Sequence, residues 1–167
     1  MKNNKVIVAI DKNNLKESKD LILSLKKEAF AFKIGYEFFF NFGITGLKEV
    51  MKDSTKIFLD LKLHDIPNTV SQGIQAINKL KPYFTTIHLS GGDEMQKNAL
   101  LSKGQVKLLG VSILTSIDNE QAKKYYFNQN IEEIITKFAN YALLNQLDGI
   151  VCSPKEIKII KKIVSNK

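Results

Sequence analysis

The sequence predicts an α/β fold, an incomplete TIM-type (β/α)8 barrel with about six of its eight strand–helix units present. Short apolar runs alternate with longer amphipathic stretches along all 167 residues, and no hairpin-type turn joins two of the runs. The runs are nearly continuous in Ile, Val, Leu and Phe, as in parallel strands that are covered on both faces. Because 44% of the residues are hydrophobic, the chain can bury one good core, and we expect a single domain over residues 1–167.

The apolar runs are the expected strands, since they are short and rich in Ile, Val, Phe and Leu. They are Val6–Ile10, Phe30–Ile34, Ile57–Leu61, Phe84–Leu89, Lys107–Ile113 and Gly149–Cys152. The longer stretches between them are amphipathic, which is typical of helices that cover a sheet. They are Leu15–Lys27, Ile44–Lys52, Thr69–Lys79, Glu94–Ser102, Ile131–Asn145 and Pro154–Val164. Asn68 and Ser153 are expected to cap two of these helices, and Pro154 suits a first helical turn.

The choice between a closed barrel and an open doubly wound sheet depends on the first strand–helix junction. A dinucleotide-binding sheet carries a Gly-rich phosphate loop there, whereas this chain reads VAIDKNN at residues 8–14. Polar side chains instead follow nearly every expected strand, at the end where barrel enzymes assemble their active sites. They are Asp11, Lys33, Asp60, Lys62, His88, Ser90, Thr115, Ser116 and Ser153. The barrel is therefore the favoured prediction.

The net charge of +8 invites a nucleic-acid interpretation, which the composition disfavours. All 25 basic residues are lysine, whereas nucleic-acid-binding proteins generally use arginine for bidentate and stacking contacts. No apolar run approaches the ~18 residues of a membrane span. Cys152 is the only cysteine, which excludes an internal disulfide and fits a reducing compartment. We therefore expect a cytoplasmic protein that binds neither nucleic acid nor membrane.

The stretch FLDLKLHDIPNT, residues 58–69, places three charges at the end of an expected buried strand. Asp60 and Lys62 are two residues apart and therefore face the same side of a regular strand, toward the barrel mouth. Asp65 follows in the loop, where it can reach back to Lys62, and Lys33 ends the neighbouring strand. The four side chains form an alternating array of ammonium and carboxylate groups, and each kind favours the charged form of the other.

Such an array is either a structural ion-pair network or the centre of an active site. Asp11 and Thr115 at other strand ends favour the active site, because barrel enzymes collect their functional residues along this rim. A charged lysine between carboxylates can donate a proton beside negative charge, which suits a reaction that stabilises and protonates a carbanion. The two histidines, one cysteine and scattered acids show no metal-ligand spacing, so no metal is expected.

The same residues resemble a known family. DLKLHDIPNT, residues 60–69, resembles the signature of the orotidine 5'-phosphate decarboxylases. The segments VAID, FKIGYEFF, IHLSGG, VSILTS and LDGIVCSP resemble that family at the other strands, in the same order, so the match covers essentially the whole chain. The general pattern Asp-x-Lys-x-x-Asp is shared with sister decarboxylases and aldolases that act on sugar phosphates. The Ile-Pro-Asn-Thr extension indicates the nucleotide enzyme.

The resemblance implies a reaction and roles for individual residues. The implied reaction is the decarboxylation of orotidine 5'-phosphate to UMP in de novo pyrimidine biosynthesis, with no metal or organic cofactor. Lys62 matches the lysine that protonates C6 of the pyrimidine, Asp60 the carboxylate that faces the substrate carboxylate, and Lys33 a second lysine that also reaches the ribose. The other implied substrate ligands are Asp11 for a ribose hydroxyl and Thr115 and Ser116 for the base.

The resemblance also implies a homodimer, because Asp65 and Thr69 match residues that reach into the partner's site. Full members of the family continue with two more strand–helix units, which carry the arginines that grip the substrate phosphate, and this chain contains no arginine. Binding energy from a remote phosphate helps to stabilise the transition state. We therefore expect residues 1–167 alone to be poorly stable and to have little activity.

Three alternatives stay open. A sister sugar-phosphate decarboxylase or synthase on the same barrel would commonly require magnesium. A non-catalytic remnant, or one half of a split enzyme, would retain the array by descent, and the split form would gain activity only on mixing with its missing third. A basic nucleic-acid-binding module is the weakest alternative and would show salt-dependent binding.

Overall fold

The structure, a computed structural model, describes residues 5–52 and 55–165; the outer ends of the expected domain, including Lys167, lie outside the described residues. Its strands form one parallel sheet in chain order, β1-β2-β3-β4-β5-β6. They are β1 (Ile7–Ala9), β2 (Ala31–Ile34), β3 (Ile57–Leu63), β4 (Phe84–His88), β5 (Lys107–Val111) and β6 (Gly149–Val151). Each expected strand is therefore present, within two residues of its predicted ends.

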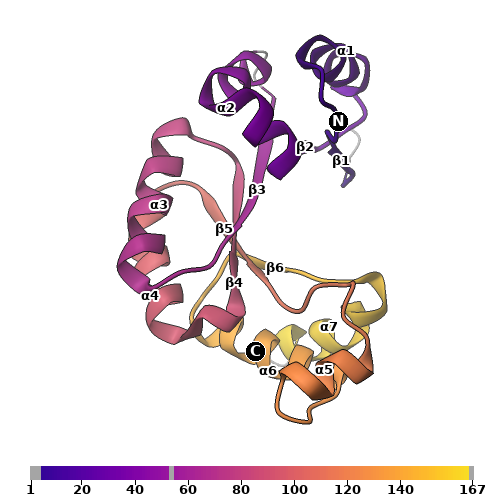
Figure 1. Cartoon of the computed structure of the whole chain (residues 1–167), viewed down its shortest axis with the longest axis vertical. Coiled ribbons are helices and arrows are strands. Elements are labelled where there is room, and N and C mark those ends of the chain that lie inside the picture. The colour runs from indigo at the N-terminus through magenta and orange to yellow at the C-terminus, as the bar shows by residue number, and fades with distance from the viewer. Residues whose placement is uncertain (1–4, 53–54, 166–167) are drawn as a thin grey trace.

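The sheet is curled, and the helices lie along its outer side (Figure 1). Strands β1 and β6 form its two edges, and the open side of the curl lies between them. Six parallel strands in this arrangement form a half-barrel, which confirms the expected incomplete TIM-type barrel rather than a doubly wound sheet. The carboxyl ends of all six strands point to one rim, where the polar residues of the strand ends are placed.

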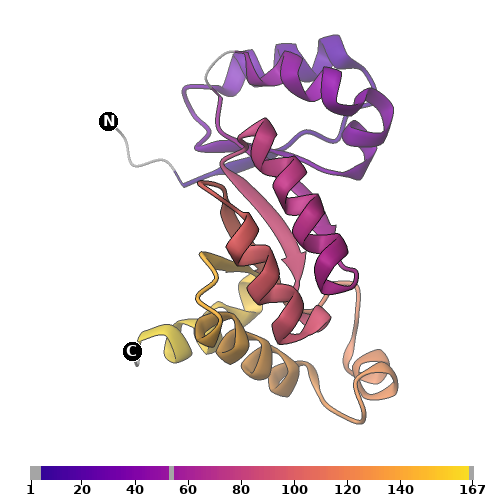
Figure 2. The same ribbon diagram turned by 90° about the vertical axis from the view of Figure 1, so that its left-hand side faces the viewer.

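The helices follow the strands, with two short 3-10 turns among them. They are α1 (Leu15–Leu25), α2 (Tyr36–Met51), α3 (Pro67–Leu80), η1 (Leu89–Gly91), α4 (Gly92–Ser102), α5 (Asn119–Tyr125), α6 (Ile131–Leu144), η2 (Pro154–Glu156) and α7 (Ile157–Ser165). Figure 2 shows α3 and α4 side by side across the outer face of the sheet. Among the described residues, none of the helices combines the length and apolarity that a membrane crossing requires.

Three local predictions were wrong. Helix α2 begins at Tyr36, well before the expected start at Ile44, because its aromatic first half is joined to the second half across a kink at Gly43 (φ 57°, ψ −156°), a conformation that glycine tolerates. Helix α5 was not expected; Asp118 caps it by accepting a hydrogen bond from the Gln121 amide. Asn68 does not cap α3, because the helix already begins at Pro67.

The predicted cap at Ser153 is confirmed. Its hydroxyl accepts a hydrogen bond from the Lys155 amide, and Glu156 accepts one from the Ser153 amide, so the two residues form a capping box. The turn that they start is a 3-10 turn, and α7 follows it at Ile157. Pro154 occupies the first position of the turn, as expected.

Two apolar clusters hold the sheet to its helices. The larger one joins the first five strands to α1–α4 and includes the fully buried Phe32, Ile34, Leu59 and Ile74. A smaller cluster around Ile135 lies beyond the end of β5, between α5 and α6. The rim at β2–β4 is therefore supported by packing in the larger cluster, whereas the rim at β5–β6 is supported by packing in the smaller cluster.

Candidate active site

The end of β3 departs from regular strand geometry at the position of the charged residues. Leu59 pairs with Thr85 and Leu63 with Ile87, so four positions along β3 correspond to two along β4. Within this bulge Lys62 has a φ of 44°, in the left-handed region that costs a residue with a side chain about 1–2 kcal/mol. The regular alternation expected from the sequence is absent here. Such strain persists only where surrounding contacts hold it.

Asp60 is the centre of the charged cluster. Its side chain is only 8% exposed, and its Oδ2 lies 2.8 Å from Lys62 Nζ and 3.8 Å from Lys33 Nζ. Its Oδ1 accepts a hydrogen bond of 2.9 Å from the Thr86 hydroxyl on β4. Both carboxylate oxygens therefore have partners, as a buried charge requires. The two lysine side chains are about a quarter exposed, whereas the carboxylate that they share is almost fully buried.

Asp65 does not join this cluster within the chain. Its carboxylate is exposed and accepts a hydrogen bond of 2.6 Å from the Ile66 amide, and it makes no ion pair with Lys62 in the described part of the chain. Thr69 is also exposed, in the first turn of α3. Three members of the expected array, Lys33, Asp60 and Lys62, are thus brought together, and the fourth stays at the surface.

Two histidines lie beside the cluster. The rings of His64 and His88 have centroids 5.1 Å apart. The pKa of His88 is lowered, chiefly because burial disfavours its charged form, and further by the nearby His64 and Lys62, while Asp60 acts in the opposite direction. The lowered pKa favours the neutral imidazole of His88 at the edge of the site.

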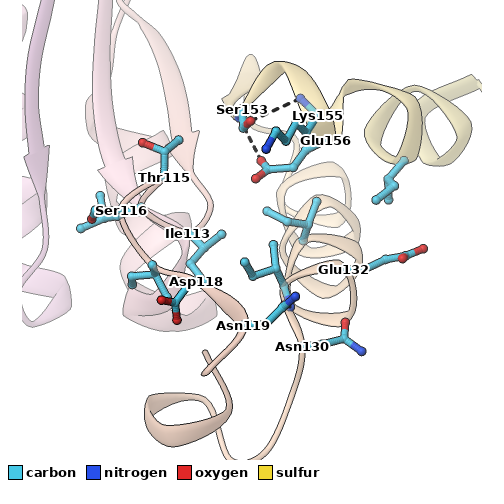
Figure 3. A pocket seen from close by; sticks show the side chains of 15 residues that line it. Ile113, Thr115, Ser116, Asp118, Asn119, Asn130, Glu132, Ser153, Lys155 and Glu156 are labelled. Atoms are coloured by element: carbon cyan, nitrogen blue, oxygen red, sulfur yellow. Dashed lines mark hydrogen bonds between the residues drawn. The ribbon is translucent and has the colours of Figure 1, made fainter. Parts of the chain in front are cut away.

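Thr115 and Ser116 lie at a separate part of the rim. They line an open hollow of about 770 Å³ together with Ser153 and Glu156, and no member of the Lys33–Asp60–Lys62 cluster lines it. Figure 3 shows Thr115 and Ser116 on the loop after β5, with Ser153, Lys155 and Glu156 across the hollow.

The side chains of Thr115 and Ser116 are exposed and make no hydrogen bond with any described residue. Asp11, after β1, is exposed as well. The chain therefore leaves these three predicted substrate ligands open, and their part in binding stays a prediction.

Cys152 directly follows β6 and precedes Ser153, which lines this hollow. Burial raises the pKa of its thiol, and the nearby Glu156 raises it further. A thiol with a raised pKa carries little of the nucleophilic thiolate. Cys152 is therefore a poor candidate for a nucleophile.

Thr86 is the residue of the site that sequence reasoning missed. It is fully buried on β4, and it contacts both charged residues of β3: its oxygen accepts a hydrogen bond of 2.9 Å from the Lys62 amide while its hydroxyl donates to Asp60. The available signal was the pair of threonines in FTTIH, a run that otherwise reads as an apolar strand.

The arrangement can bind an anion at the two ammonium groups and can donate a proton from Lys62 beside a fixed negative charge. Both functions need a lysine that is held in one place and remains accessible, which the buried Asp60 and the quarter-exposed lysines provide. Among the described residues, no group of three or more His, Cys, Asp and Glu side chains is placed to hold a metal ion.

Comparisons with known proteins give matches over nearly the whole chain. A model of the Orotidine 5'-phosphate decarboxylase / HUMPS family matches residues 4–167. The orotidine 5'-phosphate decarboxylase of Wolbachia sp. subsp. Brugia malayi (strain TRS) is 39% identical over 92% of this chain and 69% of its own length. That of Buchnera aphidicola subsp. Baizongia pistaciae (strain Bp) is 39% identical over 99% of this chain and 72% of its own.

Solved structures are similar over the same extent. The orotidine 5'-phosphate decarboxylase of Lactobacillus acidophilus has a TM-score of 0.82 and 38% identity, covering 96% of this chain and 76% of that one. An uncharacterized conserved protein from Geobacillus kaustophilus has a TM-score of 0.87 and 27% identity, covering 93% of this chain and 77% of that one. By its sequence over nearly its full length, this chain belongs to the Orotidine 5'-phosphate decarboxylase / HUMPS family.

Proposed function

We propose that this site decarboxylates orotidine 5'-phosphate to UMP in pyrimidine biosynthesis and that Lys62 is the proton donor. The observation that carries the proposal is the ion-pair cluster in which the buried Asp60 carboxylate holds Lys62 Nζ at 2.8 Å and has Lys33 Nζ at 3.8 Å. Relatives named orotidine 5'-phosphate decarboxylase, 39% identical to the chain, support the reaction.

The proposed step is a replacement of carbon dioxide by a proton at C6 of the pyrimidine. The bond between C6 and the carboxylate carbon breaks, its electron pair stays on C6, and carbon dioxide leaves. Lys62 Nζ gives a proton to that electron pair, so the ammonium becomes an amine and regains its proton from solvent. A donor already fixed by Asp60 needs little reorganisation at the moment of reaction.

The family resemblance supplies the surrounding roles. Lys33, on the neighbouring strand, would neutralise the substrate and reach its ribose. Asp11 would bind a ribose hydroxyl, and Thr115 and Ser116 would recognise the base. Their exposure, without hydrogen bonds to other described residues, leaves their polar groups available to a ligand.

A homodimer is part of the proposal. Asp65 and Thr69 are exposed at the start of α3, beside the 67%-exposed Ile66. A second copy that covered this segment would receive Asp65 and Thr69 at its own site. We further propose that the enzyme works in the cytoplasm, since its one cysteine fits a reducing compartment. We also propose that it uses no cofactor, as the family resemblance implies.

The direct test is turnover of orotidine 5'-phosphate by the purified chain, followed as carbon dioxide release. Lys62→Ala should lower kcat by about 10²–10⁴-fold because it removes the proton donor. Lys19→Ala is the matched control: Lys19 lies on α1, where its ammonium pairs with Glu49 of α2 at 3.2 Å, so its loss should leave kcat unchanged. Turnover that survives Lys62→Ala would contradict the assignment.

The turnover assay, extended with added magnesium, UMP binding and a complementing polypeptide, distinguishes the remaining alternatives. Little turnover by residues 1–167 alone stays a prediction, and efficient turnover would overturn it while supporting the reaction. A requirement for added magnesium would favour a sister sugar-phosphate enzyme. Absence of both turnover and UMP binding, measured by calorimetry, would favour a non-catalytic remnant. Activity that appears only with a complementing polypeptide would favour a split enzyme.

A further inference from the structure

We infer that Thr86 and Tyr36 are positioning residues for Lys62. Their side chains clamp the peptide group between Leu61 and Lys62 by hydrogen bonds that replace the backbone hydrogen bonds of a regular sheet. Thr86 also bonds the Asp60 carboxylate and so links it to this clamp. The inference rests on the proposed function for its catalytic consequence, because Lys62 matters as a proton donor. Its structural content stands on the contacts alone.

The peptide group between Leu61 and Lys62 is held by side chains at both ends. Its carbonyl, that of Leu61, accepts a hydrogen bond of 3.0 Å from the Tyr36 hydroxyl of α2. Its N–H, that of Lys62, donates at 2.9 Å to the Thr86 oxygen of β4. In a regular parallel strand both groups would bond to neighbouring backbones. Here the register of β3 and β4 shifts between Leu59 and Leu63, and the two side chains take the place of the ladder.

The two side-chain hydrogen bonds explain how the left-handed φ of Lys62 persists. A backbone conformation that costs about 1–2 kcal/mol relaxes unless its neighbours fix it. Two hydrogen bonds on one peptide plane fix its orientation, and that plane sets the direction in which the Lys62 side chain leaves the strand. The cluster geometry thus depends on Thr86 and Tyr36 as well as on the charges.

The Thr86 hydroxyl has a defined direction. It carries one hydrogen, and it must accept from the Lys62 amide because that N–H can only donate. Its hydrogen is then available to Asp60 Oδ1, at 2.9 Å. One side chain therefore sets both the backbone of the proton donor and the orientation of the carboxylate that pairs with it. Serine would preserve both bonds, and valine would remove both at nearly constant volume.

Thr85 offers a matched control on the same strand. It is also fully buried, and its hydroxyl donates to the Leu59 carbonyl at 3.0 Å, so it too bonds the backbone of β3. Its hydroxyl makes no hydrogen bond with the Asp60 carboxylate or the Lys62 amide, both of which bond Thr86 instead. Thr85→Val therefore loses one buried hydrogen bond to β3 and Thr86→Val loses two, and only the second variant loses the clamp.

The first measurement is amide hydrogen exchange at Lys62 by NMR, which needs no catalysis. In Thr86→Val the Lys62 amide should exchange at least about tenfold faster than in the parent chain, because its acceptor is gone. Thr85→Val should leave the Lys62 rate within about twofold of the parent after correction for global stability, and Thr86→Ser should restore protection. Unchanged exchange in Thr86→Val, or equal acceleration in both valine variants, would overturn the clamp.

The second measurement is the kinetics of orotidine 5'-phosphate decarboxylation. Thr86→Val should lower kcat by about 10²-fold with little change in KM, because misplacing the donor affects the chemical step more than binding. Thr86→Ser should recover most of the loss, and Thr85→Val should stay within about twofold of the parent. Tyr36→Phe should cost less, about tenfold or below, because the half-exposed tyrosine hydroxyl can be replaced by water.

The two measurements test different claims: hydrogen exchange tests whether the clamp exists, and kinetics tests whether it positions the proton donor. A kcat that Thr86→Val does not change would overturn the positioning role even if exchange at Lys62 accelerates. A parent chain that shows neither turnover nor UMP binding would count against the proposed function alone. In that case the exchange data still decide whether the clamp exists.

Discussion

The ends of β3 and β5 lie at equivalent places on the barrel rim, and both carry polar side chains that the sequence predicts to be functional. They differ in the burial and the hydrogen bonding of those side chains. At the end of β3 the carboxylate of Asp60 is buried, and both of its oxygens have partners within the chain. At the end of β5 Thr115 and Ser116 are exposed around an open hollow, without hydrogen bonds to other described residues.

The difference shows what each region requires before a ligand arrives. A buried carboxylate without partners would cost several kcal/mol, so the chain must assemble the Asp60 cluster as it folds. An exposed hydroxyl is satisfied by water and can exchange that water for a substrate group at little cost. The β3–β4 region is therefore organised by folding, whereas the β5–β6 region is available to be organised by binding.

Removing the central charge should have the largest effect on stability in this comparison. Asp60→Asn leaves two lysines converging on a neutral group, and we expect a loss of about 1–3 kcal/mol in the free energy of unfolding, below the ~3–5 kcal/mol of fully buried pairs because the lysines are partly exposed. Urea unfolding measures the loss.

The control for that experiment is Asp118→Asn. Asp118 caps α5 from an exposed position, and asparagine caps a helix about equally well, so we expect almost no change in unfolding free energy. If Asp60→Asn were as neutral as this control, or stabilising, then the cluster would be a strained arrangement that folding tolerates rather than one that it gains from.

The backbone at Lys62 provides the next test. Glycine accepts a φ of 44° without the penalty that alanine meets, so Lys62→Gly should be about 1 kcal/mol more stable than Lys62→Ala. Both variants lose the same ion pair, and their difference isolates the backbone. Lys81, which caps α3 with a φ of 54°, should show the same preference. Equal stabilities at position 62 would mean that the bulge relaxes once the lysine is gone.

Acid should destabilise the β3–β4 region through His88. The pKa of His88 is lowered in the fold, so below pH 6.5 the unfolded chain takes up a proton that the folded chain resists, and stability falls with decreasing pH. Burial contributes most to this effect, His64 and Lys62 add to it, and Asp60 opposes it. Between pH 7.5 and 5.5 the unfolding free energy of the parent should fall more steeply than that of His88→Gln. Parallel curves would show that this imidazole is not held neutral.

The smallest effect is expected at the end of β5. Thr115→Ala and Ser116→Ala should change the unfolding free energy by less than about 0.5 kcal/mol, because these exposed hydroxyls bond no described residue. Both should raise KM for orotidine 5'-phosphate with kcat nearly constant, as for contacts made equally in ground and transition states. A stability loss above ~1 kcal/mol at either position would break the contrast with β3.

Much of this molecule followed from sequence pattern alone. Continuous apolar runs alternating with amphipathic stretches determined the parallel α/β architecture, because only a sheet covered on both faces accommodates such strands. The polar residues that end the strands indicated the rim, since parallel strands bring their carboxyl ends to one edge. The spacing of Asp60 and Lys62, with Lys33 on the next strand, predicted the ion-pair cluster that the structure contains.

Other features came from contacts that sequence periodicity does not describe. The early start of α2 and the short α5 depend on a kink at Gly43 and a cap at Asp118, which are local geometries without a repeating pattern. The exclusion of Asp65 from the cluster depends on the direction in which the loop leaves β3, which its sequence separation from Lys62 does not fix.

The bulge at the end of β3 shows most clearly which features the sequence determined and which the tertiary structure decided. Sequence placed a lysine and a carboxylate two residues apart on a strand, and chemistry required them to pair. Tertiary structure decided how they pair, because the left-handed backbone of Lys62 is held by Thr86 from β4 and Tyr36 from α2, residues 24 and 25 positions from their partners. Local sequence determines which groups are present, but the strain at a functional residue can be held only by neighbours that the fold brings to it.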